Sequence, residues 1–240
     1  MKQPVLSLII ACYNEEPHLR QSISTVMSVL GDSVFSYELI FVDDKSQDNT
    51  REIIASLVKK NNNFRAIYHA INQGRGKSIR DGIAIARGKV VGFIDIDLEV
   101  SPVYMPSFVR MILSGDADVV TGLRVYREGF SSIHRSILSR GYSWLVRSAL
   151  GIPLHDTETG YKFFHRKKIL SIVQKTKNNG WFWDTEIMTY AHYDGLAIHE
   201  EPVLFIRRFD KKSSVRLIHD TLDYMRNLLA FRKRLLARGR

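Results

Sequence analysis

Short apolar runs alternate with helix-like patterns through the first hundred residues, and this alternation limits the possible folds more than any other feature of the chain. The runs are rich in valine, isoleucine and phenylalanine and have the length of buried strands. Between them, apolar residues recur three and four positions apart, as on one face of a helix. Strands that alternate with helices are typical of a parallel, doubly wound α/β sheet. The expected strands cover residues 5–11, 37–42, 64–68 and a run that begins at residue 90.

A polar cluster follows each of the four expected strands. The clusters come after Ala11, Val42, Tyr68 and Ile94. In open α/β sheets, ligands bind at the carboxyl ends of the strands. The coincidence of four clusters predicts a binding site at that edge more strongly than any single motif does.

The run that begins at Val90 ends with acids at alternate positions, namely Asp95, Asp97 and Glu99. Strand alternation would put these three carboxylates on one side of the sheet. Grouped carboxylates repel one another unless a cation neutralises them, and oxygen ligands suit Mg²⁺ or Mn²⁺. The pattern therefore favours a divalent-metal site that holds a diphosphate. A strand that ends in solvated acids is the alternative, and these three residues alone do not decide between the two.

A glycine-rich basic loop over residues 72–77 lies before an expected helix. Gly74 and Gly76 would let backbone amides approach a phosphate closely, and Arg75 or Lys77 would add positive charge. The spacing is neither that of a P-loop nor that of a G-x-G-x-x-G dinucleotide motif. Taken alone, the loop is a weak signal for phosphate binding.

The second half of the chain shows less regular patterns. A loop is expected over residues 126–134, an acidic loop over residues 155–161, and an aromatic and acidic segment over residues 181–186. The expected helices cover residues 19–30, 53–58, 78–86, 102–113, 135–150 and 187–192, and the further expected strands cover residues 117–121 and 203–206.

Positive charge gathers at the C-terminal end. The chain has a formal charge of +10, and residues 207–240 hold eleven basic and three acidic side chains, which leaves +8. The helix pattern over residues 215–236 has an apolar side, and its polar positions are mostly basic. Such a helix either lies in the interface of an anionic membrane or docks on the core with a solvated basic face. The pattern favours neither alternative.

The composition limits the class of protein. Cys12 is the only cysteine, so the chain has no internal disulfide and no multi-cysteine zinc site. We expect no signal peptide after Met1, and no apolar stretch reaches the ~20 residues of a membrane-spanning helix. A hydrophobic share of 45% is enough for a sizeable core.

Taken together, these segments resemble the inverting nucleotide-sugar glycosyltransferases of family two, which have the GT-A fold. The nearer resemblance is to the dolichyl-phosphate mannose synthase group, which includes bacterial polyprenyl-phosphate sugar transferases. It covers nearly the whole chain, from about residue 5 to residue 215. The residues that carry it are Tyr13, Asn14 and Glu15, residues 42–46, Asn72 with Gly74 and Gly76, residues 95–99, Gly122, Leu123 and Arg124, residues 156–160, and Asp184 with Glu186.

The resemblance implies a division of the chain. Residues 1–214 would form a GT-A domain, a Rossmann-like, mostly parallel central sheet flanked by helices. Within it, residues 1–122 would bind the nucleotide sugar and the metal, and residues 123–214 would bind the acceptor. Residues 215–240 would form a basic C-terminal amphipathic helix.

The resemblance also implies roles for single residues. The nucleotide sugar would contact Tyr13, Glu15, Asp43, Asp44, Gly74, Arg75, Lys77 and Asp95. Mg²⁺ or Mn²⁺ would be held by Asp95, Asp97 and Glu99. The acceptor phosphate would meet Arg124, Arg135, Arg207 and Arg208. The catalytic residues would be Asp97, Asp156, Arg124 and Arg135, with Asp156 either a base or an orienting group.

The implied reaction is a metal-dependent, inverting transfer of a hexose from a nucleotide sugar, of the GDP-mannose or UDP-glucose type, to a polyprenyl or dolichyl phosphate. The residue types agree with this chemistry, because a metal and guanidinium groups stabilise the charge that develops on the leaving diphosphate. An ionised phosphate acceptor needs no strong base, and arginine matches phosphate geometry. The protein would bind peripherally to the anionic surface on the cytoplasmic face of a membrane.

Two other functions account for part of the sequence. The same fold could serve a saccharide or protein hydroxyl as acceptor, which requires a true general base, with Asp156 or Asp184 as candidates. A basic nucleic-acid-binding module would explain the net charge. The acidic clusters at the strand ends would repel a phosphate backbone, so we expect no nucleic-acid partner.

Overall fold

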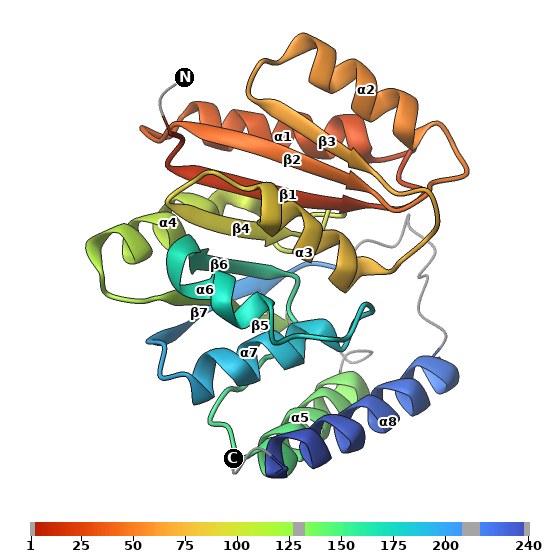
Figure 1. Cartoon of the computed structure of the whole chain (residues 1–240), viewed down its shortest axis with the longest axis vertical. Helices are drawn as coiled ribbons and strands as arrows, with labels where there is room; N and C mark the ends of the chain where they lie inside the picture. Colours follow the sequence, from red (N-terminus) through yellow and green to blue (C-terminus); the bar gives the residue numbers. More distant parts are fainter. Residues whose placement is uncertain (1–2, 127–132, 208–216, 238–240) are drawn as a thin grey trace.

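The structure is a computed structural model that describes residues 3–126, 133–207 and 217–237 (Figure 1). In the two helices that border the gaps, the side chains of residues 133–140, 142 and 217–221 lie outside the description. The strands are β1 (Leu6–Cys12), β2 (Tyr37–Asp43), β3 (Phe64–Tyr68), β4 (Val90–Ile94), β5 (Val119–Tyr126), β6 (Tyr161–His165) and β7 (Ile198–Phe205). The helices are α1 (Leu19–Gly31), α2 (Thr50–Lys60), α3 (Arg75–Ile85), α4 (Met105–Ser114), α5 (Ile133–Leu150), α6 (Arg166–Val173), α7 (Trp183–Tyr193) and α8 (Leu217–Leu236), with a 3₁₀ turn, η1 (Pro102–Tyr104), before α4.

The seven strands form one sheet in the order β3-β2-β1-β4-β6-β5-β7. β1 to β4 are parallel, as are β5 and β7, whereas β6 is antiparallel to both of its neighbours. Hydrophobic burial on both faces suits such a sheet, because helices cover each side. The expected α/β fold with a mostly parallel central sheet flanked by helices is therefore confirmed.

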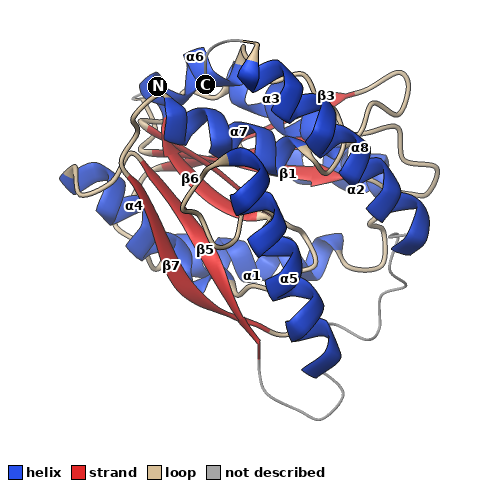
Figure 2. Ribbon diagram, turned by 90° about the horizontal axis from the view of Figure 1, so that it is seen from below, coloured by secondary structure: helices blue, strands red, loops and turns tan. Residues whose placement is uncertain are grey.

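Two apolar layers lie on opposite faces of the sheet, and alternate residues of each strand point into them. Ile9 and Phe93 belong to the layer covered by α3, α5, α6, α7 and α8, and Leu8 and Ile94 belong to the layer covered by α1, α2 and α4. Figure 2 shows α3 and α6 on one side of the strands and α1 on the other. Burial of apolar surface in both layers is the main force that holds this architecture together.

β6 is the element that the sequence patterns did not indicate, and the short helix α6 after it was also not expected. Lys162 interrupts the apolar residues of β6. A lysine in a central strand hides the strand pattern because lysine is almost never fully buried unless it is paired. Here its side chain is 0% exposed and its ammonium lies 3.0 Å from the Asp184 carboxylate. A long-range ion pair therefore permits this strand.

Several element boundaries differ from the expected ones. β4 ends at Ile94, so Asp95, Asp97 and Glu99 follow the strand and are not part of it. The expectation that strand alternation aligns these three carboxylates was wrong, because the chain turns after the strand and Leu98 has a φ of 54°. β5 extends to Tyr126, and β7 starts as early as Ile198.

The C-terminal helix α8 docks on the core. Tyr224, Leu228, Phe231 and Leu235 are buried in the layer that contains α7, and Figure 1 shows α8 beside α5 at one end of the molecule. The opposite face of α8 remains open to solvent. Among the described residues, no helix has the length and apolar character that a membrane span requires.

Candidate active site

The reversed direction of β6 brings the second acidic loop to the rim where the parallel strands end. Tyr161, the first residue of β6, pairs with Ile94, the last residue of β4. The Asp95 amide donates a 3.0 Å hydrogen bond to the Gly160 carbonyl. A Cβ atom at residue 160 would lie 1.8 Å from an Asp95 carboxylate oxygen, so any larger residue there would displace the Asp95 side chain. The loop over residues 156–160 and the acids after β4 thus share one rim.

A chain of buried charges crosses this rim. The Arg75 guanidinium donates to the Asp95 carboxylate from Nε at 3.0 Å and from Nη2 at 2.7 Å, and Nη1 donates to Asp184. Lys162 donates to the other oxygen of Asp184 at 3.0 Å. Burial alone would lower the pKa of Arg75, but Asp184 and Asp95 outweigh burial and raise it. Burial lowers the pKa of Lys162 despite its contact with Asp184.

Aromatic rings enclose the Arg75 guanidinium. It lies 5.4 Å from the centre of the Phe93 ring and 5.1 Å from that of the Trp181 ring. Contacts of this kind favour a cation most when water is excluded. Sequence analysis expected Arg75 to offer its charge to a diphosphate from an open loop. The structure instead engages it with carboxylates, so a diphosphate would meet an arginine already held in place.

Arg124 and Asp156 form the second charged pair of the rim. Arg124 Nε and Nη2 donate to the two Asp156 oxygens at 2.6 and 2.9 Å. Asp156 Oδ1 also accepts from the amides of Glu158 and Thr159, each at 3.1 Å. Burial would raise the pKa of Asp156, but the charge and hydrogen bonds of Arg124, together with the charge of Lys162, lower it below the ordinary value. A carboxylate held in this way suits the orientation of Arg124 better than proton abstraction.

Glu158 is a rim residue that sequence analysis did not single out, although it lies inside the motif at residues 156–160. Its carboxylate is 4.0 Å from the Arg124 guanidinium, and its side chain is 37% exposed. Burial raises its pKa to about 7, with Asp156 and Asp184 adding to the effect and Arg124 opposing it. The sequence offered one indication of its role, because Glu158 is an acidic residue between Thr157 and Thr159 in that motif.

The loops after β1 and β2, on the predicted donor side, are joined by hydrogen bonds. The Asn14 amide donates to Ser46 Oγ at 3.0 Å, and the Gln47 amide donates to Asn14 Oδ1 at 2.7 Å. Tyr13 is 44% exposed beside them, and Glu15 is buried, with its amide donating to Thr50. The predicted nucleotide-binding residues Tyr13 and Glu15 therefore lie together with the loop after β2.

Asp43 and Asp44 have different surroundings. Asp44 accepts from the amides of Gln73 and Gly74 at 2.8 and 2.7 Å and faces His69 Nδ1 at 2.6 Å. Asp43 Oδ1 accepts from the Ser46 amide at 3.2 Å, while Oδ2 is buried without a hydrogen-bond partner among the described residues. A buried carboxylate oxygen without a partner can accept a hydrogen bond from an N–H or O–H group of a ligand. Of the two, Asp43 has the free acceptor.

The glycine-rich loop does not form the open phosphate cradle that we expected. A Cβ atom at Gly74 would lie 2.5 Å from the Asn179 carbonyl oxygen, and one at Gly76 would lie 2.4 Å from Trp183 Cβ. The two glycines thus let the chain near residue 180 pack against α3, and the Gly74 amide is occupied by Asp44. The Lys77 ammonium is also engaged within its own helix, because it donates to both Asp81 carboxylate oxygens at 2.5 Å.

The predicted metal ligands lie at the rim but are not grouped as a set. Within the described ranges, no three His, Cys, Asp or Glu side chains are arranged to hold a metal ion. The donor chemistry nevertheless fits Mg²⁺ or Mn²⁺, because Asp95 is 39% exposed there and Asp97 follows it in the same turn. Asp97 Oδ1 accepts from the Glu99 amide at 3.3 Å.

The remaining predicted arginines are only partly described. Arg207 is exposed and follows Ile206, whose amide donates to the Glu99 carbonyl at 2.8 Å. That bond brings the end of β7 to the acids after β4. Arg135 belongs to α5, but its side chain and all of Arg208 lie outside the described residues. Their predicted contacts with an acceptor stay predictions.

The fold and the rim define an α/β protein whose charged and buried polar groups gather at the carboxyl ends of the strands, where ligands bind in open α/β sheets. The match of residues 7–172 to the family described as Glycosyl transferase family 2 then identifies the chain, which belongs to that family.

Relatives with assigned names agree with the family. Glycosyltransferase AglD of Haloferax volcanii is 30% identical over 223 residues, which are 90% of this chain and 35% of that protein. A dolichyl-phosphate beta-glucosyltransferase of Dictyostelium discoideum is 28% identical over 82% of this chain and 65% of its own length. One of Trichomonas vaginalis is 27% identical over 82% of this chain and 64% of its own length. The chain thus spans from about a third to just under two thirds of these relatives.

Solved structures share the fold. Glucosyl-3-phosphoglycerate synthase from Mycobacterium tuberculosis in complex with UDP has a TM-score of 0.72 at 21% identity, over 96% of this chain and 80% of that one. The same enzyme with Mn²⁺, UDP and glucosyl-3-phosphoglycerate has a TM-score of 0.68 at 22% identity, over 95% and 80% of the two chains. At this identity the likeness concerns the fold alone.

Proposed function

We propose that this glycosyltransferase moves a hexose from a nucleotide sugar to a polyprenyl or dolichyl phosphate, with inversion, at the cytoplasmic surface of a membrane. The observation that carries the proposal is the Arg124–Asp156 pair, which presents an oriented guanidinium on the rim that also bears Asp95 and Asp97. Cationic and carboxylate groups on one rim suit a reaction between two phosphorylated substrates. The names of two relatives favour a dolichyl phosphate as acceptor and glucose as the sugar.

The donor nucleotide would occupy the loops after β1 and β2. Asp43 Oδ2, buried and without a partner in the described structure, would accept a hydrogen bond from an N–H group of the base. Tyr13, at the same edge, offers an exposed ring for contact with the nucleoside. Asp44 and Glu15 would act mainly through the loops that they hold together.

Asp97, with Asp95 and Glu99, would hold Mg²⁺ or Mn²⁺ at the donor diphosphate. When bound, such an ion supplies Lewis-acid stabilisation of the charge that develops on the leaving diphosphate. Arg75 would add positive charge from beneath the rim. Its position costs no reorganisation during the reaction, because Asp95 and Asp184 already fix its guanidinium.

Arg124 would hold the acceptor phosphate. In the step itself, a phosphate oxygen of the acceptor forms a bond to the anomeric carbon as the bond from that carbon to the diphosphate oxygen breaks. The nucleoside diphosphate leaves with the electron pair, and a single displacement inverts the anomeric centre. An ionised phosphate needs no base, which agrees with the lowered pKa of Asp156. Arg135, Arg207 and Arg208 are further candidates for acceptor contacts.

The exposed face of α8 supports membrane attachment. Leu222, Leu229 and Leu236 recur every seven residues and are 54%, 59% and 64% exposed. The exposed bases Arg226 and Lys233 lie between them on the same stripe. Exposed leucines with interleaved cations suit the interface of an anionic bilayer. We name the face made by these five residues the outer face of α8.

The reaction is tested by incubation of the protein with Mn²⁺, a panel of UDP- and GDP-sugars, and a short polyprenyl phosphate, with mass spectrometry of the lipid fraction. A glycosyl-phospholipid supports the proposal. Transfer to added saccharides or peptides without any lipid product would favour the hydroxyl-acceptor alternative. Asp97→Asn should reduce lipid glycosylation at least about a hundredfold, whereas Asp116→Asn, at an exposed site, should not.

Membrane attachment is tested separately with Leu229→Gln and Leu236→Gln in one chain. We expect weaker sedimentation with vesicles of phosphatidylcholine and phosphatidylserine, because two exposed apolar side chains are lost. Deletion of α8 is a poorer test, since it would also uncover the core beneath Phe231. Unchanged sedimentation would remove the outer face from the proposal.

A further inference from the structure

The side of α8 that faces the protein reaches both loops on the acceptor side of the candidate active site. Phe231 packs edge-on against Phe182 and Tyr190, with ring centres 5.7 and 5.2 Å away. Tyr224 meets Phe182 in the same way at 4.9 Å. These contacts seat α8 on the length of α7, from the residue before its first turn to Tyr190. Polar side chains beside the rings then extend from α8 toward the rim.

The first polar connection runs from Tyr224 to the loop that contains Asp156. The Tyr224 hydroxyl shares a hydrogen bond with Thr185 Oγ1, which shares a second one, 2.9 Å long, with Thr157 Oγ1. Thr185 is 0% exposed and Thr157 is 4% exposed, so no water competes for these hydroxyls. Thr157 follows Asp156, the carboxylate that orients Arg124. The position of this loop therefore depends on α8.

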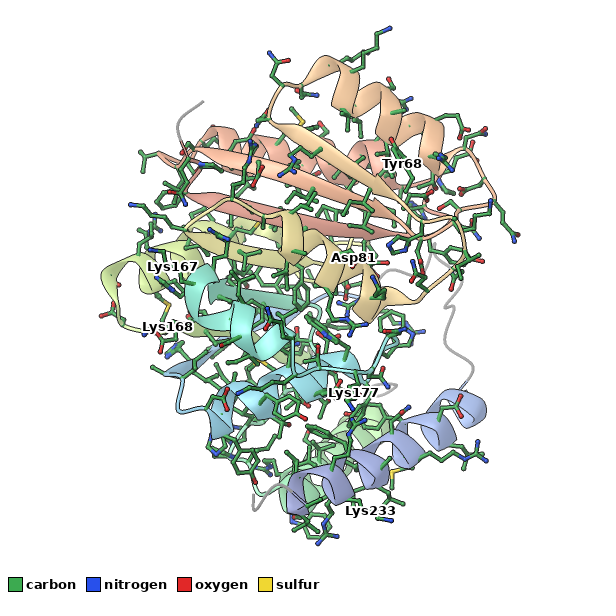
Figure 3. The ribbon with its side chains drawn as sticks, viewed as in Figure 1. Tyr68, Asp81, Lys167, Lys168, Lys177 and Lys233 are labelled. Atoms are coloured by element: carbon green, nitrogen blue, oxygen red, sulfur yellow. The ribbon has the colours of Figure 1, made fainter. Side chains whose placement is uncertain are left out.

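The second connection runs from Arg234 to the turn over residues 177–181. Arg234 Nη2 donates to Glu186 Oε1 at 2.8 Å, and Glu186 is fully buried. The other Glu186 oxygen accepts from the amides of Lys177 and Asn178, both at 2.8 Å. Figure 3 shows Lys177 on the segment between the sheet and α8. One buried carboxylate thus joins α8 to the turn.

Asn227 adds a third bond between α8 and the same turn. Its side-chain oxygen accepts from Asn178 Nδ2 at 3.1 Å, and its own amide group donates to the Asp223 carbonyl at 2.8 Å. The orientation of the Asn227 side chain is therefore fixed by its own helix.

The turn over residues 177–181 in turn supports the start of α3. The Lys77 amide donates to the Asn179 carbonyl at 3.1 Å, and the Trp181 ring covers the Arg75 guanidinium. Gly74 and Gly76 permit this close approach of the two segments. A displacement of the turn would release Arg75 on the side away from the carboxylates.

We propose that α8 is a positioning element of the active centre, in which Tyr224 holds the loop of Asp156 and Arg124, and Arg234 holds the turn that covers Arg75. The role in catalysis rests on the proposed glycosyltransferase reaction. The contacts themselves can be measured without that reaction. The three α8 side chains, Tyr224, Asn227 and Arg234, have no proposed contact with substrate. They act through Thr157, Glu186 and Asn178.

The positioning role is separate from membrane binding because the two use opposite faces of one helix. Leu229 and Lys233 belong to the outer face, whereas Tyr224 is 9% exposed and its hydroxyl points to Thr185. Figure 3 shows Lys233 on α8. Changes on the outer face should alter vesicle binding alone, and changes on the inner face should alter the site alone.

The test is hydrogen exchange of the backbone amides in the full-length chain without membrane. We expect Tyr224→Phe to speed exchange in residues 156–160 and Arg234→Met to speed it in residues 177–181, each roughly three- to tenfold, the factor that loss of one hydrogen bond gives. Arg226→Met is the matched control, an identical substitution on the same helix. The Arg226 side chain is 80% exposed in an ion pair with Asp223, so neither segment should change.

A second pair of variants guards against unfolding. Arg234→Met leaves the buried Glu186 without its cation, which can destabilise the whole chain. The double variant Glu186→Gln with Arg234→Met removes both charges and keeps an acceptor for the turn amides. Arg234→Lys keeps the cation and should restore most of the protection. Equal exchange in wild type, Tyr224→Phe and the double variant would overturn the proposal.

Calorimetry with UDP and with GDP, each with Mn²⁺, links the loops to the site. We expect Arg234→Met and the double variant to bind the preferred nucleotide roughly three- to tenfold more weakly than wild type, and Arg234→Lys and Arg226→Met to bind it as wild type does. Nucleotide binding that is unchanged in Arg234→Met and in the double variant, despite faster exchange, would also overturn the positioning role. A wild-type chain that binds neither nucleotide would contradict the proposed function, while the exchange data would still decide whether α8 holds the loops.

Discussion

On the predicted donor side of the rim, hydrogen bonds to backbone amides hold the loops after β1, β2 and β3, whereas on the predicted acceptor side buried ion pairs add to such bonds around β5 and β6. On the predicted donor side, the Asp44 carboxylate accepts hydrogen bonds from the backbone amides of Gln73 and Gly74. On the acceptor side, Asp184 is 1% exposed and lies between two cations, Arg75 and Lys162. The first arrangement fixes the conformation of the loops, and the second places fixed charges at the rim.

The two arrangements differ in their cost in folding free energy. Backbone hydrogen bonds nearly replace those lost to water, so their net contribution is small. Buried charges are costly to desolvate, and apolar residues of the same size are often at least as stable. A chain that nevertheless buries Arg75, Lys162 and Asp184 beneath a rim has a site in which fixed charge is available to substrates.

An identical substitution on each side measures this contrast. Asp184→Asn removes the shared partner of two buried cations, and we expect a loss of ~3–5 kcal/mol in the free energy of unfolding. Asp44→Asn loses acceptor capacity for amides and should cost ~1–3 kcal/mol. Urea unfolding of both variants gives the comparison, provided that the dependence on urea is unchanged.

Asp116→Asn serves as the surface reference for both variants and should stay within ~0.5 kcal/mol of wild type. If Asp44→Asn proves as costly as Asp184→Asn, the two sides do not differ in the way described.

Substitution of Gly74 tests the contact between the loop before α3 and the turn over residues 177–181. Gly74 and Gly115 both have positive φ, 97° and 87°, but a Cβ at Gly74 meets the Asn179 carbonyl at 2.5 Å and one at Gly115 meets nothing within 4 Å. Gly115→Ala should therefore cost only the backbone term, ~1–2 kcal/mol. Gly74→Ala should cost ~1–3 kcal/mol more, because the turn near residue 180 must move and because Gly74, with a ψ of 159°, lies in a backbone region essentially confined to glycine, whereas Gly115, with a ψ of 7°, is in the left-handed helical region. Thermal unfolding and hydrogen exchange of residues 177–181 would measure both effects.

Faster exchange in that segment is expected for Gly74→Ala alone. Similar losses of stability in the two variants would mean that the donor loop and the acceptor-side turn are not closely packed.

The smallest effect concerns Glu158, the acceptor-side acid with a raised pKa. Its carboxyl titrates near 4.5 when unfolded and near 7 when folded, so between these values the folded chain holds a proton that the unfolded chain has released. The contribution of Glu158 to the free energy of unfolding therefore falls as pH rises from about 4.5 to 7. Glu158→Gln stays neutral and should be more stable than wild type above pH 7, by less than ~1 kcal/mol because solvent screens this side chain.

Thermal unfolding at pH 4 and pH 8 measures the difference, which corresponds to at most roughly 2–4 °C at pH 8 and to no gain at pH 4. A gain of equal size at both values would show that the carboxyl does not titrate as described.

Much of the donor side follows from local patterns. The strands around Ile9, Ile40 and Phe93 are short apolar runs, and each is followed by polar residues, so both the parallel sheet and the edge with its polar loops were predicted from the sequence. These features depend on residues that are close in the chain, and hydrophobic periodicity reports them directly. The motif that ends in Gly160 was also identified, since its residue types resemble those of a known family.

The acceptor side depended on contacts between residues far apart in the chain. No local pattern shows that Lys162 is a strand residue, because its burial requires Asp184, 22 positions later. The same holds for Arg75, whose partners Asp95 and Asp184 come from two other elements, and for the inner face of α8. Local periodicity therefore determines the sheet and the edge at which its polar loops gather, whereas pairing of distant charges determines which residues that edge presents, since the cost of burying a charge is met only by a partner that folding brings to it.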